Sequence, residues 1–361
     1  MSQNRKVEKN TAIETLRGVA IVLMVSGHVI GAKSTDGLKV ADDSIWRFFY
    51  YTFEYIRMPL FTVISGYIYA YKPLSKFASN GQFVSGKLNR LLIPLIVVST
   101  LFYVIQHFTP GVNYKNHLTD IRYIYLYPYA HFWFLQGMLV VFLIIMAFEN
   151  LNLLSKFIPS IIWLSVFTVI FIAFPYKFNN FSVHKVPFLL TFFTLGLILK
   201  RFYTIIFHSW ILKIAGLIFL CMFSYQLYIF NHPENIRLNN LLTFFVGSTA
   251  CILLIGMVWK NDRFIWLGGF SYAIYLFHIF GSVASRVVMA KLSIHNKVVQ
   301  IIFGIVIGIA FPIVLQLLLG RFKFFSVILF GEKIRANKAV LTAQENDKLI
   351  HQRPASGNAV V

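Results

Sequence analysis

Long apolar runs occupy most of this 361-residue chain. A helix that crosses the hydrocarbon core of a bilayer needs about 20 mostly apolar residues. Ten segments come close to that length and composition: 12–31, 47–70, 88–108, 132–148, 158–175, 187–206, 209–230, 239–258, 264–284 and 298–320. The sequence therefore predicts an all-α fold, a polytopic membrane helical bundle with about ten transmembrane helices.

The composition agrees with this prediction. The chain is 58% hydrophobic and 13% charged, whereas soluble domains are about 45–50% apolar and about 25% charged. The net charge is +20, but Lys and Arg lie mainly between and beside the apolar runs, which indicates orientation in a membrane and not nucleic-acid binding. Cys221 and Cys251 lie inside apolar runs, so we interpret them as small core residues and not as a disulfide.

The positive charges also predict an orientation. The first run carries Arg17 and has no small-residue cleavage pattern, so we interpret it as a retained span. A cytoplasmic N-terminus places most Lys and Arg inside, and an even number of spans returns the C-terminus to the same side. The predicted parts are a cytoplasmic N-terminus over 1–11, a transmembrane domain over 12–330 and a cytoplasmic, disordered tail over 331–361.

The first span holds two ionisable residues, which are costly in a membrane and indicate function by default. Arg17 and His28 are 11 positions apart, so they share one helix face and lie about 16 Å apart along its axis. The predicted topology places Arg17 near the cytoplasmic surface and His28 in the outer half. Either residue alone has a structural explanation, Arg17 as an anchor paired with Glu14 and His28 as a packing residue. Together they favour a functional site.

Further ionisable residues are expected at the depth of His28. Glu54 and Arg57 lie three positions apart and are predicted to pair. His131 opens the fourth span, where it could be interfacial, and His278 lies in the ninth, where it could be a packed neutral histidine. Their convergence predicts a polar chamber open to the outside. The tyrosine-rich loop over 110–131 is interpreted as an aromatic belt or as a platform on which sugars stack.

Five motifs follow one another in a characteristic order. They are Leu16-Arg17-Gly18-Val19-Ala20 with His28, Met58-Pro59-Leu60-Phe61 with Ser65-Gly66-Tyr67, Lys87 to Arg90 with Pro94, His131 to Leu135, and Ser271-Tyr272 with Tyr275-Leu276 and His278. This order, from about residue 11 to 320, resembles the acyltransferase-3 family of integral membrane acyltransferases. One departure is Lys87, where the family more often has arginine, because lysine binds phosphate as a point charge and not as a bidentate fork.

The resemblance implies an acyl-CoA-dependent O-acyltransferase of the polysaccharide O-acetyltransferase type. We expect acetyl-CoA as the donor, a glycan or lipid-linked glycan such as lipopolysaccharide O-antigen as the acceptor, the bacterial inner membrane as the location, and no metal. His28 and Arg17 are the expected catalytic residues. Arg17, Lys87 and Arg90 are expected to bind the donor, although positive-inside anchoring also explains Lys87 and Arg90. The expected acceptor-binding or oxyanion residues are Glu54, Arg57, His131, Trp133, Tyr275 and His278.

Two questions stay open at this level. His28 could be a general base for the incoming hydroxyl, or it could be acylated itself and pass the group on. The alternative function is a transporter or flippase for a polar lipid or sugar, but the sequence shows neither repeated halves nor matching broken helices. A purely structural anchor would leave the intramembrane ionisable residues unexplained.

Overall fold

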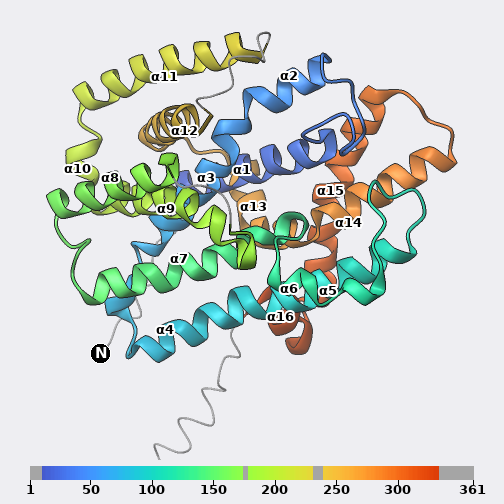
Figure 1. The fold of residues 1–361 in the computed structure, drawn as a ribbon, viewed down its shortest axis with the longest axis horizontal. Helices are drawn as coiled ribbons and strands as arrows, with labels where there is room; N and C mark the ends of the chain where they lie inside the picture. The colour runs from blue at the N-terminus through green and yellow to red at the C-terminus, as the bar shows by residue number, and fades with distance from the viewer. Residues whose placement is uncertain (1–9, 174–177, 231–238, 333–361) are drawn as a thin grey trace, which may run out of the picture.

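The computed structural model describes residues 10–173, 178–230 and 239–332, and within these ranges every regular element is a helix (Figure 1). The long helices are α1 Thr11–Ile30, α3 Glu54–Tyr69, α5 Ile93–Phe108, α7 Trp133–Asn150, α8 Phe157–Ala173, α9 Val186–Arg201, α11 Ser209–Phe230, α12 Asn239–Gly256, α14 Ser271–Lys291 and α15 Lys297–Leu319. The all-α prediction is confirmed. The predicted disorder of the tail lies almost wholly outside the described residues, as do residues 1–9.

Shorter helical elements connect and flank the long ones. The α-helices among them are α2 Ile45–Thr52, α4 Asn80–Lys87, α6 Tyr123–Leu126, α10 Tyr203–Ile206, α13 Asp262–Gly269 and α16 Lys323–Phe330. The tighter or wider turns are η1 Leu74–Lys76, the π-helical η2 Leu88–Leu92, η3 Leu118–Asp120, η4 Ala130–Phe132 and η5 Asn180–Lys185. These elements place several of the expected site residues.

Every predicted span coincides with a long helix, but not all ten have the length and composition of a full crossing. In the described part of the chain, seven helical segments are long and apolar enough, and they contain α1, α5, α7, α9, α11, α14 and α15. Of the other three, α8 and α12 are shorter apolar helices. The third, α3, is 16 residues long and carries Glu54, Arg57 and Pro59.

Three predicted spans have different boundaries in the structure. The span over 47–70 is divided at Phe53 into α2 and α3. The span over 187–206 ends at Arg201, because Phe202 leaves the helical conformation with φ −115° and ψ 37°. The span over 264–284 is broken at Phe270, so the long helix runs from Ser271 to Lys291.

The break before α14 has a local cause. Gly268 and Gly269 precede Phe270, and glycine disfavours a continuous helix by about 1 kcal/mol relative to alanine. Gly268 also lies against the backbone carbonyl of Glu14, where a side chain would have no room. The glycine pair therefore ends α13 and lets it pack closely on α1.

Helix α1 forms the interior of the bundle, packed against α3, α13, α14 and α15 (Figure 1). Asn10 caps its start, since its side chain accepts hydrogen bonds from the backbone N–H groups of Ala12 and Ile13 at 3.1 and 3.3 Å. Gly18 faces the backbone of Phe264 at a distance that no Cβ would allow. Small residues at helix contacts allow this close approach in membrane bundles. The close packing holds the first half of α1 against α13.

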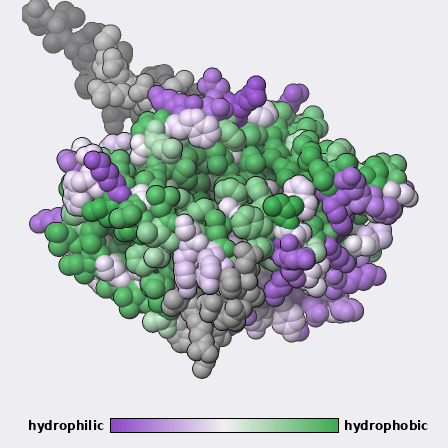
Figure 2. Space-filling model, turned by 90° about the horizontal axis from the view of Figure 1, so that it is seen from above, coloured by the Kyte–Doolittle hydropathy of each residue, from purple (hydrophilic) through white to green (hydrophobic). Residues whose placement is uncertain are grey.

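The outer surface is largely apolar. Figure 2 shows hydrophobic residues across the middle of one face and hydrophilic residues gathered at its margins. Helices α11 and α15 expose large aliphatic side chains, Leu217, Leu220, Ile302 and Val314 among them. Such a surface fits lipid as its solvent. Cys251 is buried and Cys221 is exposed on α11, and both are free, so the core interpretation was wrong for Cys221.

Candidate active site

His28 lies in the last turn of α1 and faces a large cavity. Its helix ends at Gly31, whose φ of 87° belongs to the region that favours glycine. The cavity has a volume of about 1060 Å³, and His28, Arg57, His131, Trp133 and Tyr275 are among its lining residues. A chamber is therefore present at the end of the bundle where α1 ends, but its wall is largely apolar and holds only a few polar groups, in contrast to the polar chamber predicted.

Three histidines from distant parts of the sequence meet at this cavity. The ring centroid of His28 is 5.0 Å from that of His278 and 6.3 Å from that of His131. The rings of His131 and His278 are 4.9 Å apart. Helix α1, the turn η4 and helix α14 each contribute one of them. The predicted convergence of these histidines is confirmed.

Backbone carbonyl groups fix the tautomers of the two buried histidines. His278 Nδ1 lies 3.0 and 2.9 Å from the carbonyl oxygens of Ile274 and Tyr275, and His131 Nε2 lies 3.2 Å from that of Leu276. Because a carbonyl oxygen only accepts, both nitrogens must donate. In neutral rings, His278 Nε2 and His131 Nδ1 are then acceptors, and neither has a partner among the described residues. Two unused acceptors therefore lie beside the ring of His28.

The two supporting histidines differ from His28 in their access to the cavity. His278 is 0% exposed and is not among the lining residues, whereas His131 is 3% exposed and lines the wall. Tyr275 donates a hydrogen bond from its hydroxyl to the carbonyl oxygen of His131 at 2.7 Å and so holds η4 against α14. Of the three, only His28 is well exposed to the cavity. It is the imidazole that a ligand in the cavity can reach.

Arg57 brings a positive charge next to His28. Its guanidinium lies 3.9 Å above the ring centroid of Tyr50, a cation–π contact. Its Nη1 atom occupies the space that a Cβ on Gly27 would need. The predicted ion pair with Glu54 is not formed, since no salt bridge among the described residues joins them. The guanidinium of Arg57 on α3 instead contacts Tyr50 on α2, on the other side of the break at Phe53.

Glu54 lies in a second chamber beside the first. That chamber has a volume of about 860 Å³ and shares Tyr50, Arg57, Met58 and Trp133 with the histidine cavity. Glu54 lines only the second chamber. The six predicted acceptor-side residues thus form one continuous region, with Glu54 at one side and His278 behind its wall.

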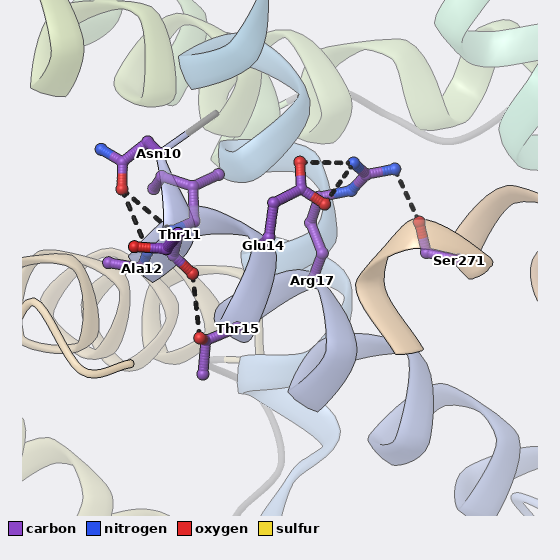
Figure 3. A network of polar contacts seen from close by, with 8 residues as sticks. Asn10, Thr11, Ala12, Glu14, Thr15, Arg17 and Ser271 are labelled. Carbon is purple, nitrogen blue, oxygen red and sulfur yellow. Dashed lines mark hydrogen bonds and ion pairs between the residues drawn. The ribbon is translucent and has the colours of Figure 1, made fainter. Parts of the chain in front are cut away.

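Arg17 occupies the other end of α1 and lines neither chamber. Its guanidinium donates to both carboxylate oxygens of Glu14 at 2.9 Å and to the hydroxyl of Ser271 at 2.7 Å (Figure 3). The pairing with Glu14, considered above as the structural explanation, is present. Ser271 adds a link to the first residue of α14, the helix that carries His278. A donor-binding role for Arg17 stays a prediction.

Lys87 is the last residue of α4, and Arg90 lies within the π-helical turn η2 that follows it. The Nζ atom of Lys87 lies 3.6 Å from the ring centroid of Phe142. The guanidinium of Arg90 lies 4.6 Å from the ring centroid of Tyr272, whose hydroxyl donates to the carbonyl oxygen of Arg90. Arg90 is exposed and Lys87 is half-buried. π-Helical turns are frequent at functional sites, but neither residue lines either chamber, and their donor-binding role stays a prediction.

Some of the residues around the site had no signal in the sequence. Gly27, Tyr50, His184 and Lys185 surround Arg57 or the second chamber. Tyr50, for example, lies in a run of aromatic residues, and nothing in the sequence distinguishes it from its neighbours. Among the residues that the structure describes, no group of three or more His, Cys, Asp or Glu side chains is arranged to hold a metal ion.

The fold and the site define a class of protein: a helical integral membrane protein with a histidine exposed in a large, mostly apolar cavity at one end of its bundle. The chain belongs to the acyltransferase-3 family, because the model of this family, described as an acyltransferase domain, matches residues 10–317. It is therefore a membrane acyltransferase. No curated protein and no solved structure matches it.

Proposed function

We propose that this acyltransferase moves an acetyl group from cytoplasmic acetyl-CoA to a sugar hydroxyl of a cell-surface polysaccharide, such as lipopolysaccharide O-antigen. It would act in the bacterial inner membrane with both termini in the cytoplasm. The observation that carries the proposal is the exposure of His28 to a cavity of about 1060 Å³ while two buried histidines contact its ring. A nucleophilic hydroxyl needs such a base, and the cavity has room for a sugar.

The proposed reaction is direct attack. An imidazole nitrogen of His28 takes the proton of the acceptor hydroxyl as its oxygen bonds to the thioester carbonyl carbon. The tetrahedral intermediate then collapses, the carbon–sulfur bond breaks, and the proton on His28 passes to the leaving thiolate of coenzyme A. The products are the O-acetyl ester and free coenzyme A. His28 ends in its starting state.

The neighbouring histidines support this role for His28. A ring N–H of His28 donated to His278 Nε2 or His131 Nδ1, the two unused acceptors, would leave its other nitrogen as a proton acceptor. A general base needs that tautomer. In their neutral forms those two nitrogens cannot donate to an oxyanion, so we reassign His131 and His278 from oxyanion stabilisation to positioning of His28.

Arg57 is the residue we propose for the negative charge that develops on the carbonyl oxygen. Its guanidinium lies beside Gly27, the residue before His28. Trp133 and Tyr275 would form walls for the acceptor. Arg17, Lys87 and Arg90 would bind the donor at the opposite end of the bundle, where cations suit the phosphates of coenzyme A.

The test is acetyl transfer by purified protein in lipid nanodiscs. Radiolabelled acetyl-CoA and surface glycan from a strain that lacks the gene are the substrates. We expect His28→Ala to lower the transfer rate by about 100-fold or more, and His295→Ala, at an exposed histidine outside both chambers, to leave it unchanged. Full transfer by His28→Ala would contradict the mechanism.

The same material separates direct attack from the covalent route. Rapid denaturation at neutral pH of wild-type protein incubated with labelled acetyl-CoA and no glycan, followed at once by mass spectrometry, would detect an acetyl group on His28 if an acyl-histidine forms. Direct attack predicts no label on the protein within the time of one turnover. Labelled protein that passes its acetyl group to added glycan would establish the covalent route instead.

A further inference from the structure

The second chamber lies at the same end of the bundle as His28. Its lining residues include the beginnings of α3 and α12, the ends of α8 and α11, and the segment before α9. It meets the histidine cavity along a wall made by Tyr50, Arg57, Met58 and Trp133, which line both. The second chamber and the histidine cavity are therefore neighbours, with Arg57 in the wall that they share.

Aromatic rings supply much of the wall of this chamber. Tyr50, Tyr51, Tyr55, Trp133, Phe188 and Phe230 are among its lining residues. Sugar rings present apolar C–H faces, which pack on aromatic rings, and hydroxyl groups, which need polar partners. Glu54 supplies a hydrogen-bond acceptor in the same wall. This combination fits a carbohydrate better than an acyl chain.

The charged residues of the second chamber favour a ligand of one charge over another. Arg57 and Lys185 line it together with one acidic residue, Glu54. The Nζ atom of Lys185 lies 5.9 Å from the ring centroid of Trp133, and no ion pair among the described residues includes either cation. His184, 9% exposed, lines the same chamber, and its Nδ1 has no hydrogen-bond partner in the described part of the chain.

Partly buried cations are stabilised by an anion of the ligand, because charges removed from water are costly unless they are paired. We propose that the second chamber binds a negatively charged sugar unit of the glycan, next to the unit that is acylated. Lys185 binds its carboxylate or phosphate group, and the aromatic rings pack on the sugar. This inference rests on the proposed function and adds the class of acceptor.

The experiment compares untreated surface glycan with the same glycan after carboxyl reduction or after removal of phosphate. The purified protein in nanodiscs transfers labelled acetyl groups to each, and KM for the glycan and kcat are measured. We expect one of the two treatments to raise KM of the wild type about tenfold, the effect of one charge-assisted hydrogen bond. The treatment that acts identifies the anion as a carboxylate or a phosphate.

Variants at Lys185 connect this preference to the chamber. Lys185→Gln should raise KM for untreated glycan about tenfold, leave kcat within about twofold, and lose the response to treatment. Lys185→Arg, which keeps the charge, should retain the wild-type KM. The control is Lys291→Gln at an exposed lysine at the same end of the bundle that lines neither chamber.

Three outcomes would overturn the inference. An unchanged KM of the wild type after both treatments would exclude an anionic acceptor. A wild-type KM in Lys185→Gln would exclude the second chamber as the site that binds the anion. Either of these leaves the proposed function intact. Absence of acetyl transfer by the wild type to untreated glycan would overturn the proposed function and the inference together.

Discussion

The imidazole rings of His28 and His278 lie 5.0 Å apart, centroid to centroid, although one residue lies in the last turn of α1 and the other in α14. His28 is exposed to the cavity, whereas His278 is fully buried and its Nε2 has no hydrogen-bond partner among the residues that the structure describes. In the proposed mechanism, His28 reacts and His278 orients it. This division of roles determines the first prediction.

Substitution of His278 should lower kcat without weakening binding of the acceptor. His278→Phe removes the acceptor nitrogen next to His28, and we expect kcat to fall about tenfold or more while KM for the glycan stays within about twofold. His278→Gln restores an acceptor oxygen and should recover part of kcat. Thermal unfolding of both variants controls for folding. A rise in KM with unchanged kcat would instead place His278 in the binding of the acceptor.

A methyl group on Gly27 should displace the guanidinium of Arg57. The Cβ of Gly27→Ala would occupy the position of Arg57 Nη1, which is the far end of a flexible side chain and can move. We expect acetyl transfer to fall about tenfold, with the melting temperature within about 2 °C of the wild type. Gly216→Ala on α11, where a Cβ meets nothing within 4 Å, is the matched control. Equal activity of the two variants would show that Arg57 is not needed in its observed position.

Arg17 forms an ion pair with Glu14 and is also expected to bind the donor. A double substitution distinguishes its effect on stability from its effect on donor binding. Arg17→Ala leaves the carboxylate of Glu14 without its 2.9 Å partner and should destabilise the protein by about 1–3 kcal/mol. Adding Glu14→Ala should restore most of that stability. If Arg17 binds the donor, KM for acetyl-CoA stays raised in the double variant. Recovery of both stability and KM would show that Arg17 serves only the ion pair.

Arg90 should matter more than Lys87 for donor affinity. Both cations lie against aromatic rings, Arg90 at Tyr272 and Lys87 at Phe142, but Arg90 is exposed and its guanidinium can form a bidentate contact with phosphate. We expect Arg90→Ala to raise KM for acetyl-CoA about tenfold and Lys87→Ala to raise it less. Lys76→Ala, at an exposed lysine, is the control. A larger effect at Lys87 would mean that its ammonium leaves the aromatic rings to bind the coenzyme.

Much of the fold was predictable because the length and apolarity of a segment are enough to identify a membrane helix. All ten predicted segments coincide with long helices of the structure, and the seventh, 209–230, matches α11. The errors fall where local backbone conformation competes with hydropathy. Phe53 and Phe270 interrupt helices inside continuous apolar runs, since hydropathy does not register a change of backbone direction.

The sequence by itself determined that this protein is a helical membrane bundle, and it placed Arg17 and His28 on one face of one helix, because helical periodicity depends only on spacing. Family motifs added the ordered set of residues. Only the tertiary structure decided which of them meet. In the tertiary structure His131 and His278 lie against His28, and Arg17 donates a hydrogen bond to Ser271. Arg57 makes a cation–π contact with Tyr50, and no ion pair among the described residues joins it to Glu54. The reason is that these contacts depend on how closely the helices approach one another. Gly18 and Gly268 allow a close approach, but its effect appears only when both partner helices are in place.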